Sequence, residues 1–307
     1  MNKTKSINRL LLFMVIWALA SSFGLGWLFR GLSAAQLLVV SELVYFLPVV
    51  GYLLIKRIRP SQWIPFKLLP ISTILMSALA AFLLLPLVTF INLLSMMFAT
   101  NFVNGTGQQL MENPFLVNLF VMAVVPAVVE ELIFRGVLYH AYREKGVILG
   151  AVACGLAFGI MHLNLNQFCY AAVLGIIFCI FVEITGSIFS SITAHFVING
   201  WNVLLLAVQQ PLQEFVSSMG QETNTALTQN EMVDAVLYYG IMAVIATALA
   251  IGVLIWMTKH CKREAHMRWC FSRHPLPEGH KKSFVTPCFI IAAAVALIIM
   301  ILQEILI

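Results

Sequence analysis

Long apolar segments constrain this chain more than any other feature of its sequence. About nine such runs follow one another, most of them near the roughly 20 residues that a helix needs to cross a bilayer. They cover residues 10–29, 31–55, 71–99, 115–143, 147–163, 168–182, 187–207, 235–258 and 284–302. Backbone polar groups in lipid must be satisfied inside each segment, as they are in a helix. We therefore predict an all-α, polytopic transmembrane helical bundle of about eight to nine spans.

Composition excludes the other common classes of protein. The 307 residues are 61% apolar and 10% charged, whereas soluble domains have about 45–50% apolar and about 25% charged residues. The net charge of +5 does not indicate nucleic-acid binding, because the basic residues lie at the ends of apolar runs. The N-terminus resembles a signal peptide, with Ala18-Leu19-Ala20 as a cleavage site. Its apolar run continues to Phe29, so we interpret it as a retained membrane anchor.

The basic residues also predict the orientation of the chain in the membrane. With the N-terminus in the cytoplasm, every Lys and Arg except Arg30 falls on the inner side. The predicted outer loops 100–114 and 208–234 contain no Lys or Arg in the sequence. We therefore expect a multi-pass protein of the cell membrane with a cytoplasmic N-terminus, and nine spans would place the C-terminus outside.

Cysteine and histidine occur together in one predicted cytoplasmic loop. This loop contains Cys261, Cys270, His260, His266, His274 and His280. The spacing CxxC or HxxxH, typical of zinc sites, does not occur there. We interpret the segment as a basic loop attracted to anionic lipid, and a zinc site is the alternative.

Ionisable and amide side chains inside the predicted spans are the most informative residues. Each ionised group costs about 2.5–3.5 kcal/mol at mid-bilayer, so each needs a partner or a function. The set is Glu42, Glu130, Glu131, Arg135, His162, Glu183, His195 and Asn199. We expect Glu183 to reach the membrane interface from the end of its span. Glu42 stands alone in the sequence and is interpreted as a packing or ion-pair residue.

Helical spacing groups several of these side chains. Glu131 and Arg135 are four residues apart and can form an ion pair, whereas Glu130 points about 100° away. His195 and Asn199 share one helix face by the same spacing. Phe158 lies one turn before His162, which predicts that the aromatic ring stacks near the imidazole.

A carboxylate and an imidazole are predicted to lie at the same depth in the membrane. A short turn at 144–146 joins two predicted helices, and Glu130 and His162 each lie roughly 22–26 Å from it. Two such groups on adjacent helices can share a water molecule, as general-base hydrolysis requires. The polar segment 164–167 is the predicted rim of a water-filled cavity. Helix packing remains an alternative explanation for each group taken alone.

Three motifs occur in order along these helices. They read EExxxR at residues 130–135, FxxxH at 158–162 and HxxxN at 195–199. In this order they resemble the CAAX protease and bacteriocin-processing family of intramembrane endopeptidases, to which type II CAAX prenyl proteases belong. The resemblance covers about residues 115–205.

The resemblance implies a role for each motif residue. Glu130 would activate a water molecule that His162 helps to hold, and His195 and Asn199 would donate hydrogen bonds to the oxyanion. The supporting residues would be Glu131, Arg135 and Phe158. The implied substrate is a peptide or membrane-associated protein, prenylated or not. No cofactor is expected, although a zinc-dependent version using Glu130, His162 and His195 stays open.

These expectations divide the chain into three parts and leave two other functions open. We predict accessory helices in 1–114, a catalytic core in 115–207 and C-terminal helices with a basic cytoplasmic loop in 208–307. A non-catalytic immunity or regulatory scaffold could retain the same residues. A proton-coupled transporter is disfavoured, since the sequence shows no internal repeat.

Overall fold

Eight helices are long and apolar enough to cross a membrane in the part of the chain that the structure describes. This structure is a computed structural model, and it describes residues 3–100, 110, 113–218, 228–272 and 283–306. A ninth apolar helix, Val147–Met161, is shorter. The predicted all-α, polytopic bundle is confirmed, and the protein is a multi-pass membrane protein.

The helices follow the predicted spans closely. The N-terminal part contains α1 (Lys3–Leu28), α2 (Ala34–Ile55), α3 (Pro60–Trp63), α4 (Ile71–Leu83) and α5 (Leu85–Met96). The next segment is a continuous helical rod of α7 (Phe115–Leu119), η1 (Phe120–Val124), α8 (Val125–Glu131), η2 (Leu132–Leu138), α9 (Tyr139–Tyr142) and η3 (Arg143–Lys145). The remaining helices are α10 (Val147–Met161), α11 (Leu165–Thr185), α12 (Ile188–Ser218), α13 (Gln229–His260), α14 (Glu264–Phe271) and α15 (Pro287–Ile305).

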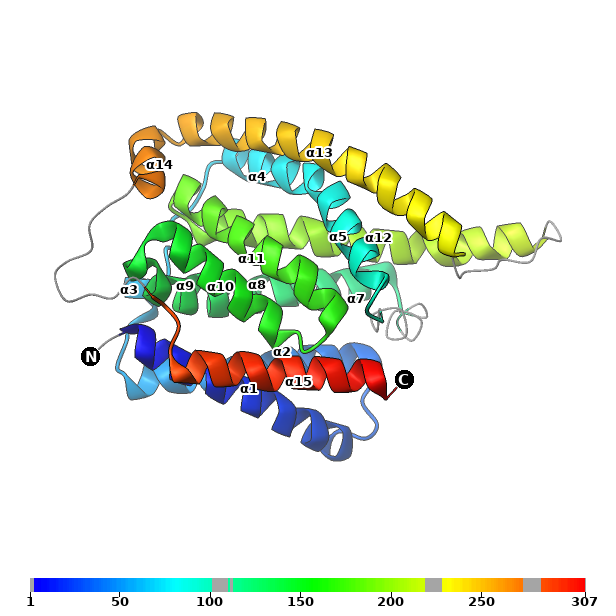
Figure 1. Ribbon diagram of the computed structural model, residues 1–307, viewed down its shortest axis with the longest axis horizontal. Helices are drawn as coiled ribbons and strands as arrows, with labels where there is room; N and C mark the ends of the chain where they lie inside the picture. The colour runs from blue at the N-terminus through cyan, green and yellow to red at the C-terminus, as the bar shows by residue number, and fades with distance from the viewer. Residues whose placement is uncertain (1–2, 101–109, 111–112, 219–227, 273–282, 307) are drawn as a thin grey trace.

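The helices form a central group with one further group on either side (Figure 1). In the centre, α10 packs on α11, α11 packs on α12, and α12 packs on α8. On one side α1 packs against α2 and α15, and on the other side α13 packs against α4 and α5. The motif residues therefore all lie on the central helices.

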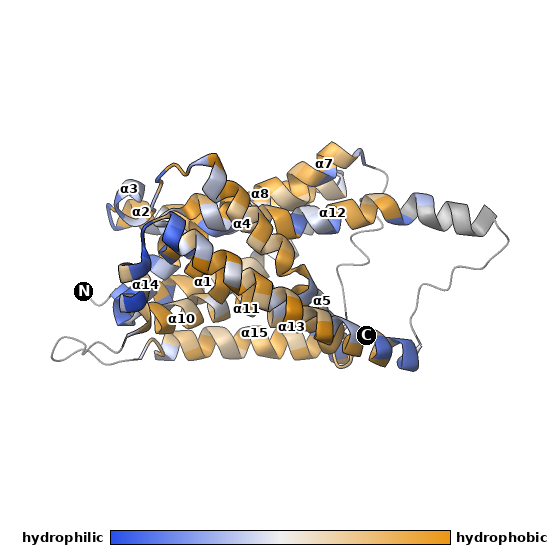
Figure 2. Cartoon of the chain, turned by 90° about the horizontal axis from the view of Figure 1, so that it is seen from above, coloured by the Kyte–Doolittle hydropathy of each residue, from blue (hydrophilic) through white to orange (hydrophobic). Residues whose placement is uncertain are grey.

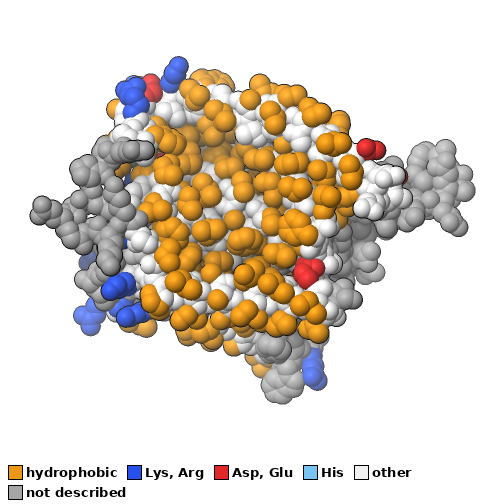
Figure 3. Space-filling model, in the orientation of Figure 1, with side chains coloured by type: hydrophobic (Ala, Val, Ile, Leu, Met, Phe, Trp, Pro, Cys, Tyr) orange, Lys and Arg blue, Asp and Glu red, His pale blue; other side chains and the backbone are white. Residues whose placement is uncertain are grey.

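The outer surface is apolar along the middle of the helices, as a lipid-facing surface must be. Figure 3 shows a broad hydrophobic surface, with most of the visible Lys and Arg side chains at the left end. Figure 2 shows hydrophilic residues concentrated near α3 and α14. The prediction that this basic end faces the cytoplasm stays a prediction.

Small residues let the two central helices α10 and α11 approach closely. A Cβ atom added to Gly155 would lie 2.5 Å from the carbonyl oxygen of Ala172, and one on Gly175 would lie 2.6 Å from the Cα of Gly155. Any larger side chain at these two positions would push the helices apart. This contact fixes α10, which carries Phe158 and precedes His162, against the centre of the bundle.

One local expectation from the sequence is wrong. The polar segment 164–167 is not an irregular cavity rim, because α11 already begins at Leu165. The Asn164 side chain accepts a hydrogen bond from the backbone N–H of Gln167 at 2.8 Å, which is a helix N-cap. Asn166 donates to Ser95 Oγ at 2.8 Å and so ties α11 to α5. The predicted span 71–99 is present as the candidate span Ile71–Met96, with a short break at Leu84 between α4 and α5.

Candidate active site

The helical rod that carries the first motif contains two π-helical segments. Glu130 and Glu131 end α8, directly between η1 and η2. Pro126 has no N–H, so it cannot donate to the carbonyl of Met122 four residues earlier. The Asn199 side chain on α12 donates to this carbonyl instead, with Nδ2 3.1 Å from the oxygen. The irregular helix is therefore joined to α12 at the HxxxN motif.

His195 lies between the two glutamates of the first motif. Its Nδ1 lies 3.0 Å from Glu131 Oε1, and its Nε2 lies 3.5 Å from Glu130 Oε2. One imidazole thus contacts two neighbouring carboxylates through its two nitrogens. The sequence predicted that Glu130 points about 100° away from Glu131, and the structure shows that both carboxylates nevertheless contact the same ring.

Arg135 holds Glu131 from the other side. Its NH1 donates to Glu131 Oε1 at 2.9 Å, and both side chains are fully buried, so the predicted ion pair is present. The guanidinium carbon also lies 4.5 Å from the centre of the Phe158 ring and 4.9 Å from that of Phe178. Phe178 in turn stacks on His195 at 5.4 Å. Phe158 therefore contacts the Arg135 guanidinium and belongs to the packing around the glutamates.

Exposure distinguishes two groups among the motif residues. Glu131 and His195 are buried, with 0% and 5% of their side chains exposed, whereas 20% of the Glu130 side chain is exposed. His162 and Asn199 are also only partly buried. Part of the Glu130 side chain is therefore open at the surface of the helical bundle, whereas Glu131 is enclosed by protein.

His162 occupies the C-terminal end of α10, as predicted one turn after Phe158. Its Nδ1 lies 2.8 Å from the Phe158 carbonyl oxygen, and the two rings meet edge to face at 4.8 Å. Among the described residues no hydrogen bond joins His162 to Glu130. The shared water between these two groups stays a prediction.

Two carboxylates outside the motifs have neighbours that the sequence did not indicate. Glu42 is on α2, which packs against α8, and this places its carboxylate near Glu130, a group of the same charge. Glu183 does not simply reach the interface, because it is 3% exposed and accepts hydrogen bonds from Tyr139 and Arg143. The hydropathy pattern identified both as ionisable residues inside apolar spans, but their neighbours come from helices distant in the sequence.

Metal-binding side chains come together elsewhere in the protein. A zinc-dependent protease would need Glu130, His162 and His195 around one ion. Within the described ranges, a different group of potential ligands comes together. The ligand atoms of Glu183, His266 and Cys270 all lie within 4.8 Å of one another. Burial, followed by the nearby charge of Glu183, raises the pKa of the Cys270 thiol to about 11. This thiol therefore carries its proton at neutral pH.

Comparison with known proteins identifies the central segment. Residues 112–201 match the family model described as Type II CAAX prenyl endopeptidase Rce1-like. The predicted resemblance is confirmed for this part of the chain. The matched residues include all three motifs, and the match indicates a hydrolase of the protease class. No curated protein and no solved structure matches the chain.

Proposed function

We propose that this protein is an intramembrane endopeptidase that uses Glu130 to activate water. The observation that supports this role most directly is the difference in exposure between the two neighbouring glutamates. Glu130 is 20% exposed and Glu131 is fully buried, while His195 contacts both. A general base must be reachable by the water it deprotonates, and this favours Glu130 over the fully buried Glu131.

In the proposed reaction, the Glu130 carboxylate removes a proton from water, and the oxygen attacks the carbonyl carbon of the scissile peptide bond. The carbonyl oxygen becomes an oxyanion that accepts hydrogen bonds from His195 Nε2 and from Asn199 Nδ2. Glu130 then gives the proton to the leaving nitrogen, and the carbon–nitrogen bond breaks. The products are a carboxylate and an amine, so no oxidant or co-reactant is required.

Glu131 acts in this proposal through His195. The Glu131 carboxylate accepts a hydrogen from His195 Nδ1 and stabilises the imidazolium, which can then donate from Nε2. Arg135 holds the same carboxylate, with NH1 2.9 Å from Oε1. Asn199 can contribute although one amide hydrogen is used for the Met122 carbonyl, because a side-chain amide carries two.

The substrate class follows from the location of the site and from the family match. Glu130 lies within a helical rod that can span the bilayer, so the scissile bond must belong to a protein or peptide held at the membrane. The matched family is named for prenylated CAAX termini. We propose a membrane-associated polypeptide as the substrate, and the assay below compares prenylated with unprenylated sequences.

A cleavage assay with the purified full-length protein in lipid nanodiscs tests this proposal. We would use a panel of peptides with CAAX-type C-termini, each synthesised with and without a farnesyl group, and identify products by mass spectrometry. We expect cleavage at an internal peptide bond, at a rate that a zinc chelator changes by less than about twofold. No products from any peptide would favour a non-catalytic scaffold, and products formed equally by wild type and Glu130→Gln would mean that Glu130 is not the base. Loss of activity with the chelator would favour a zinc protease.

The Asn199→Ala variant tests the oxyanion contact. Loss of one such donor typically costs about 2.7–4 kcal/mol, so we expect kcat to fall about 100- to 1,000-fold with a smaller change in KM. Asn202→Ala is the matched control, because Asn202 is on the same helix with an exposed side chain. Thermal unfolding of both variants shows whether loss of the hydrogen bond to Met122 lowers stability, and so distinguishes a loss of stability from a loss of the oxyanion donor. An unchanged kcat in Asn199→Ala would contradict the assigned role.

A further inference from the structure

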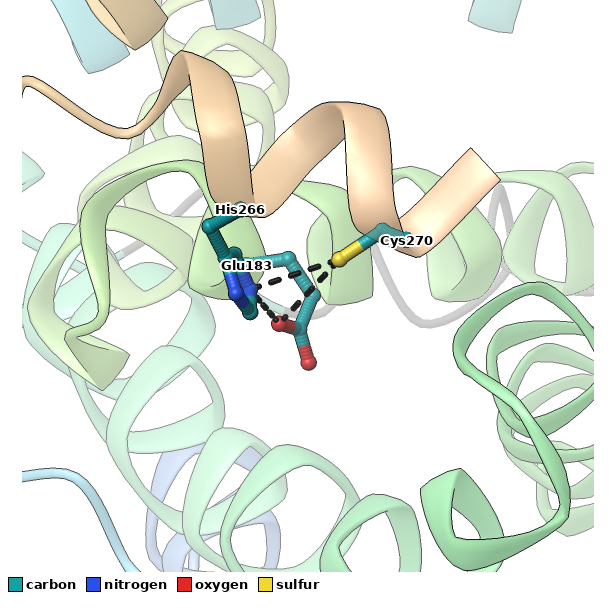
Figure 4. A group of neighbouring side chains, drawn as sticks. All are labelled: Glu183, His266 and Cys270. Carbon is teal, nitrogen blue, oxygen red and sulfur yellow. Dashed lines mark hydrogen bonds and ion pairs between the residues drawn. The ribbon is translucent and has the colours of Figure 1, made fainter. Parts of the chain in front are cut away.

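Three potential metal ligands gather where α14 packs on the end of α11 (Figure 4). His266 Nε2 lies 2.6 Å from Glu183 Oε2 and 3.3 Å from Cys270 Sγ. The third side of this triangle, from Cys270 Sγ to Glu183 Oε2, is 3.9 Å. Glu183 comes from α11, and His266 and Cys270 come from one face of α14, four residues apart.

These separations are close to those around a tetrahedral zinc ion. Bonds of about 2.0–2.3 Å to nitrogen, oxygen and sulfur place neighbouring ligand atoms about 3.3–3.6 Å apart. The separation of 3.3 Å between His266 and Cys270 lies within this range, and that of 3.9 Å between Cys270 and Glu183 is slightly longer. The third, 2.6 Å between His266 and Glu183, must lengthen by about 0.7 Å to reach this range, which side-chain rotation can provide.

The same geometry does not fit a cysteine nucleophile. In such a site one imidazole nitrogen contacts the thiol and the other contacts the orienting carboxylate. Here both Glu183 and Cys270 contact the Nε2 atom of His266. Three side chains whose polar atoms converge on one small volume are typical of a metal site, because all the ligands of such a site point at one ion.

Further contacts hold the Glu183 carboxylate in place. Tyr139 donates to Oε1 at 2.9 Å, and Arg143 lies 2.9 Å from Oε1 and 3.0 Å from Oε2. Arg263, just before α14, donates to the Glu183 backbone carbonyl at 2.9 Å. Hydrogen bonds of this kind orient the carboxylate ligands of metal sites. The Arg143 side chain is 39% exposed and can retain Oε1 while a metal takes Oε2.

We propose that Glu183, His266 and Cys270 bind one Zn²⁺, with water as the fourth ligand. The ion would displace the proton of the Cys270 thiol, and the resulting thiolate and the imidazole favour zinc over magnesium or calcium, which prefer oxygen ligands. The ion would join α14 to α11 and so fix the segment between α13 and α15 to the central helices. The site shares no residue with the proposed active site, so it does not depend on the proposed protease function.

Cobalt and zinc binding to the purified full-length protein tests this site. After removal of metals by dialysis against a chelator, Co²⁺ is added as a spectroscopic probe and then displaced with Zn²⁺. We expect one Co²⁺ per chain, with the charge-transfer absorption that a cobalt–thiolate bond produces. Zn²⁺ should abolish this absorption at stoichiometric concentration.

Single variants identify the ligands. Cys270→Ser should lose the thiolate absorption, and both Cys270→Ser and His266→Ala should bind Zn²⁺ at least about tenfold more weakly. Cys261→Ser is the matched control, because Cys261 lies in the same region but its Sγ is near Thr73 at 4.0 Å. This variant should bind both metals as wild type does. Circular dichroism and size-exclusion chromatography establish that each variant is folded.

Specific outcomes would overturn the proposed zinc site. One is a thiolate absorption that persists in Cys270→Ser or disappears in Cys261→Ser. Another is a folded wild-type protein that binds neither ion. The Glu130→Gln variant should bind Co²⁺ and Zn²⁺ unchanged, so failure of the protease proposal and failure of the zinc proposal give different results.

Discussion

The Glu130→Gln variant is expected to lose at least about a thousandfold in kcat. General-base catalysis typically contributes about 10²–10⁴-fold, and an amide cannot take a proton from water at neutral pH. Glutamine has nearly the size of glutamate, so the contacts of α8 are retained. KM should change little, because the proposed role of Glu130 is in the chemical step. Steady-state hydrolysis of the best peptide from the panel measures both constants.

Glu144→Gln is the matched control for this experiment. It makes the same chemical change in the same helical rod, but the Glu144 side chain is 47% exposed and pairs with Lys3. Its activity should stay within about twofold of wild type, since exposed ion pairs contribute little. If Glu130→Gln retained more than a tenth of the wild-type kcat, another group would have to be the base. His195, which contacts Glu131, would then be the first candidate.

The second large effect is expected from Arg135→Met. This change leaves the Glu131 carboxylate fully buried without its cation, and breaking a buried pair in this way typically costs about 3–5 kcal/mol of unfolding free energy. Contacts of the guanidinium with Phe158 and Phe178 are lost as well. Reversible unfolding in mixed detergent micelles measures the change. Arg30→Met, at an exposed position, should alter the unfolding free energy by less than about 0.5 kcal/mol.

A double variant separates stability from function at this pair. Glu131→Gln combined with Arg135→Met removes the unpaired charge, so it should recover much of the lost unfolding free energy. Activity should not recover, because the amide can no longer stabilise the His195 imidazolium. Recovery of both properties would mean that Glu131 and Arg135 serve the fold alone. Equal instability of the single and double variants would contradict the ion-pair explanation.

Some features of the candidate site could be predicted from the sequence because they depend on one helix. The contact between Glu131 and Arg135 follows from a spacing of four residues, and so does the edge-to-face contact of Phe158 with His162. The position of His195 against Glu131 could not be predicted in this way, since α12 and α8 are separated by two further spans. The family motifs indicated that these residues act together but did not indicate which of them are in contact.

Other features could not be predicted, because they depend on contacts between helices that are distant in the sequence. Glu42 looked isolated because the carboxylate near it, that of Glu130, is in a helix that packs on α2 from a distant part of the sequence. His266 and Cys270 follow a mixed H-x-x-x-C spacing, and the ligand that completes the cluster, Glu183, lies in another helix. The search for CxxC and HxxxH patterns therefore missed it. Asn199 was expected to donate to the oxyanion, and the sequence did not indicate that its side chain also donates to the Met122 carbonyl.

The sequence alone determined that this protein is a bundle of membrane-spanning helices and which polar residues inside them need an explanation. Hydropathy and helical periodicity are properties of residues close together in the sequence, so they can be read without knowledge of the fold. Only the tertiary structure decided that Glu130 is accessible and Glu131 buried, although the two are adjacent and chemically identical. Burial depends on which helices pack around a side chain, and that is set by contacts between segments far apart in the chain.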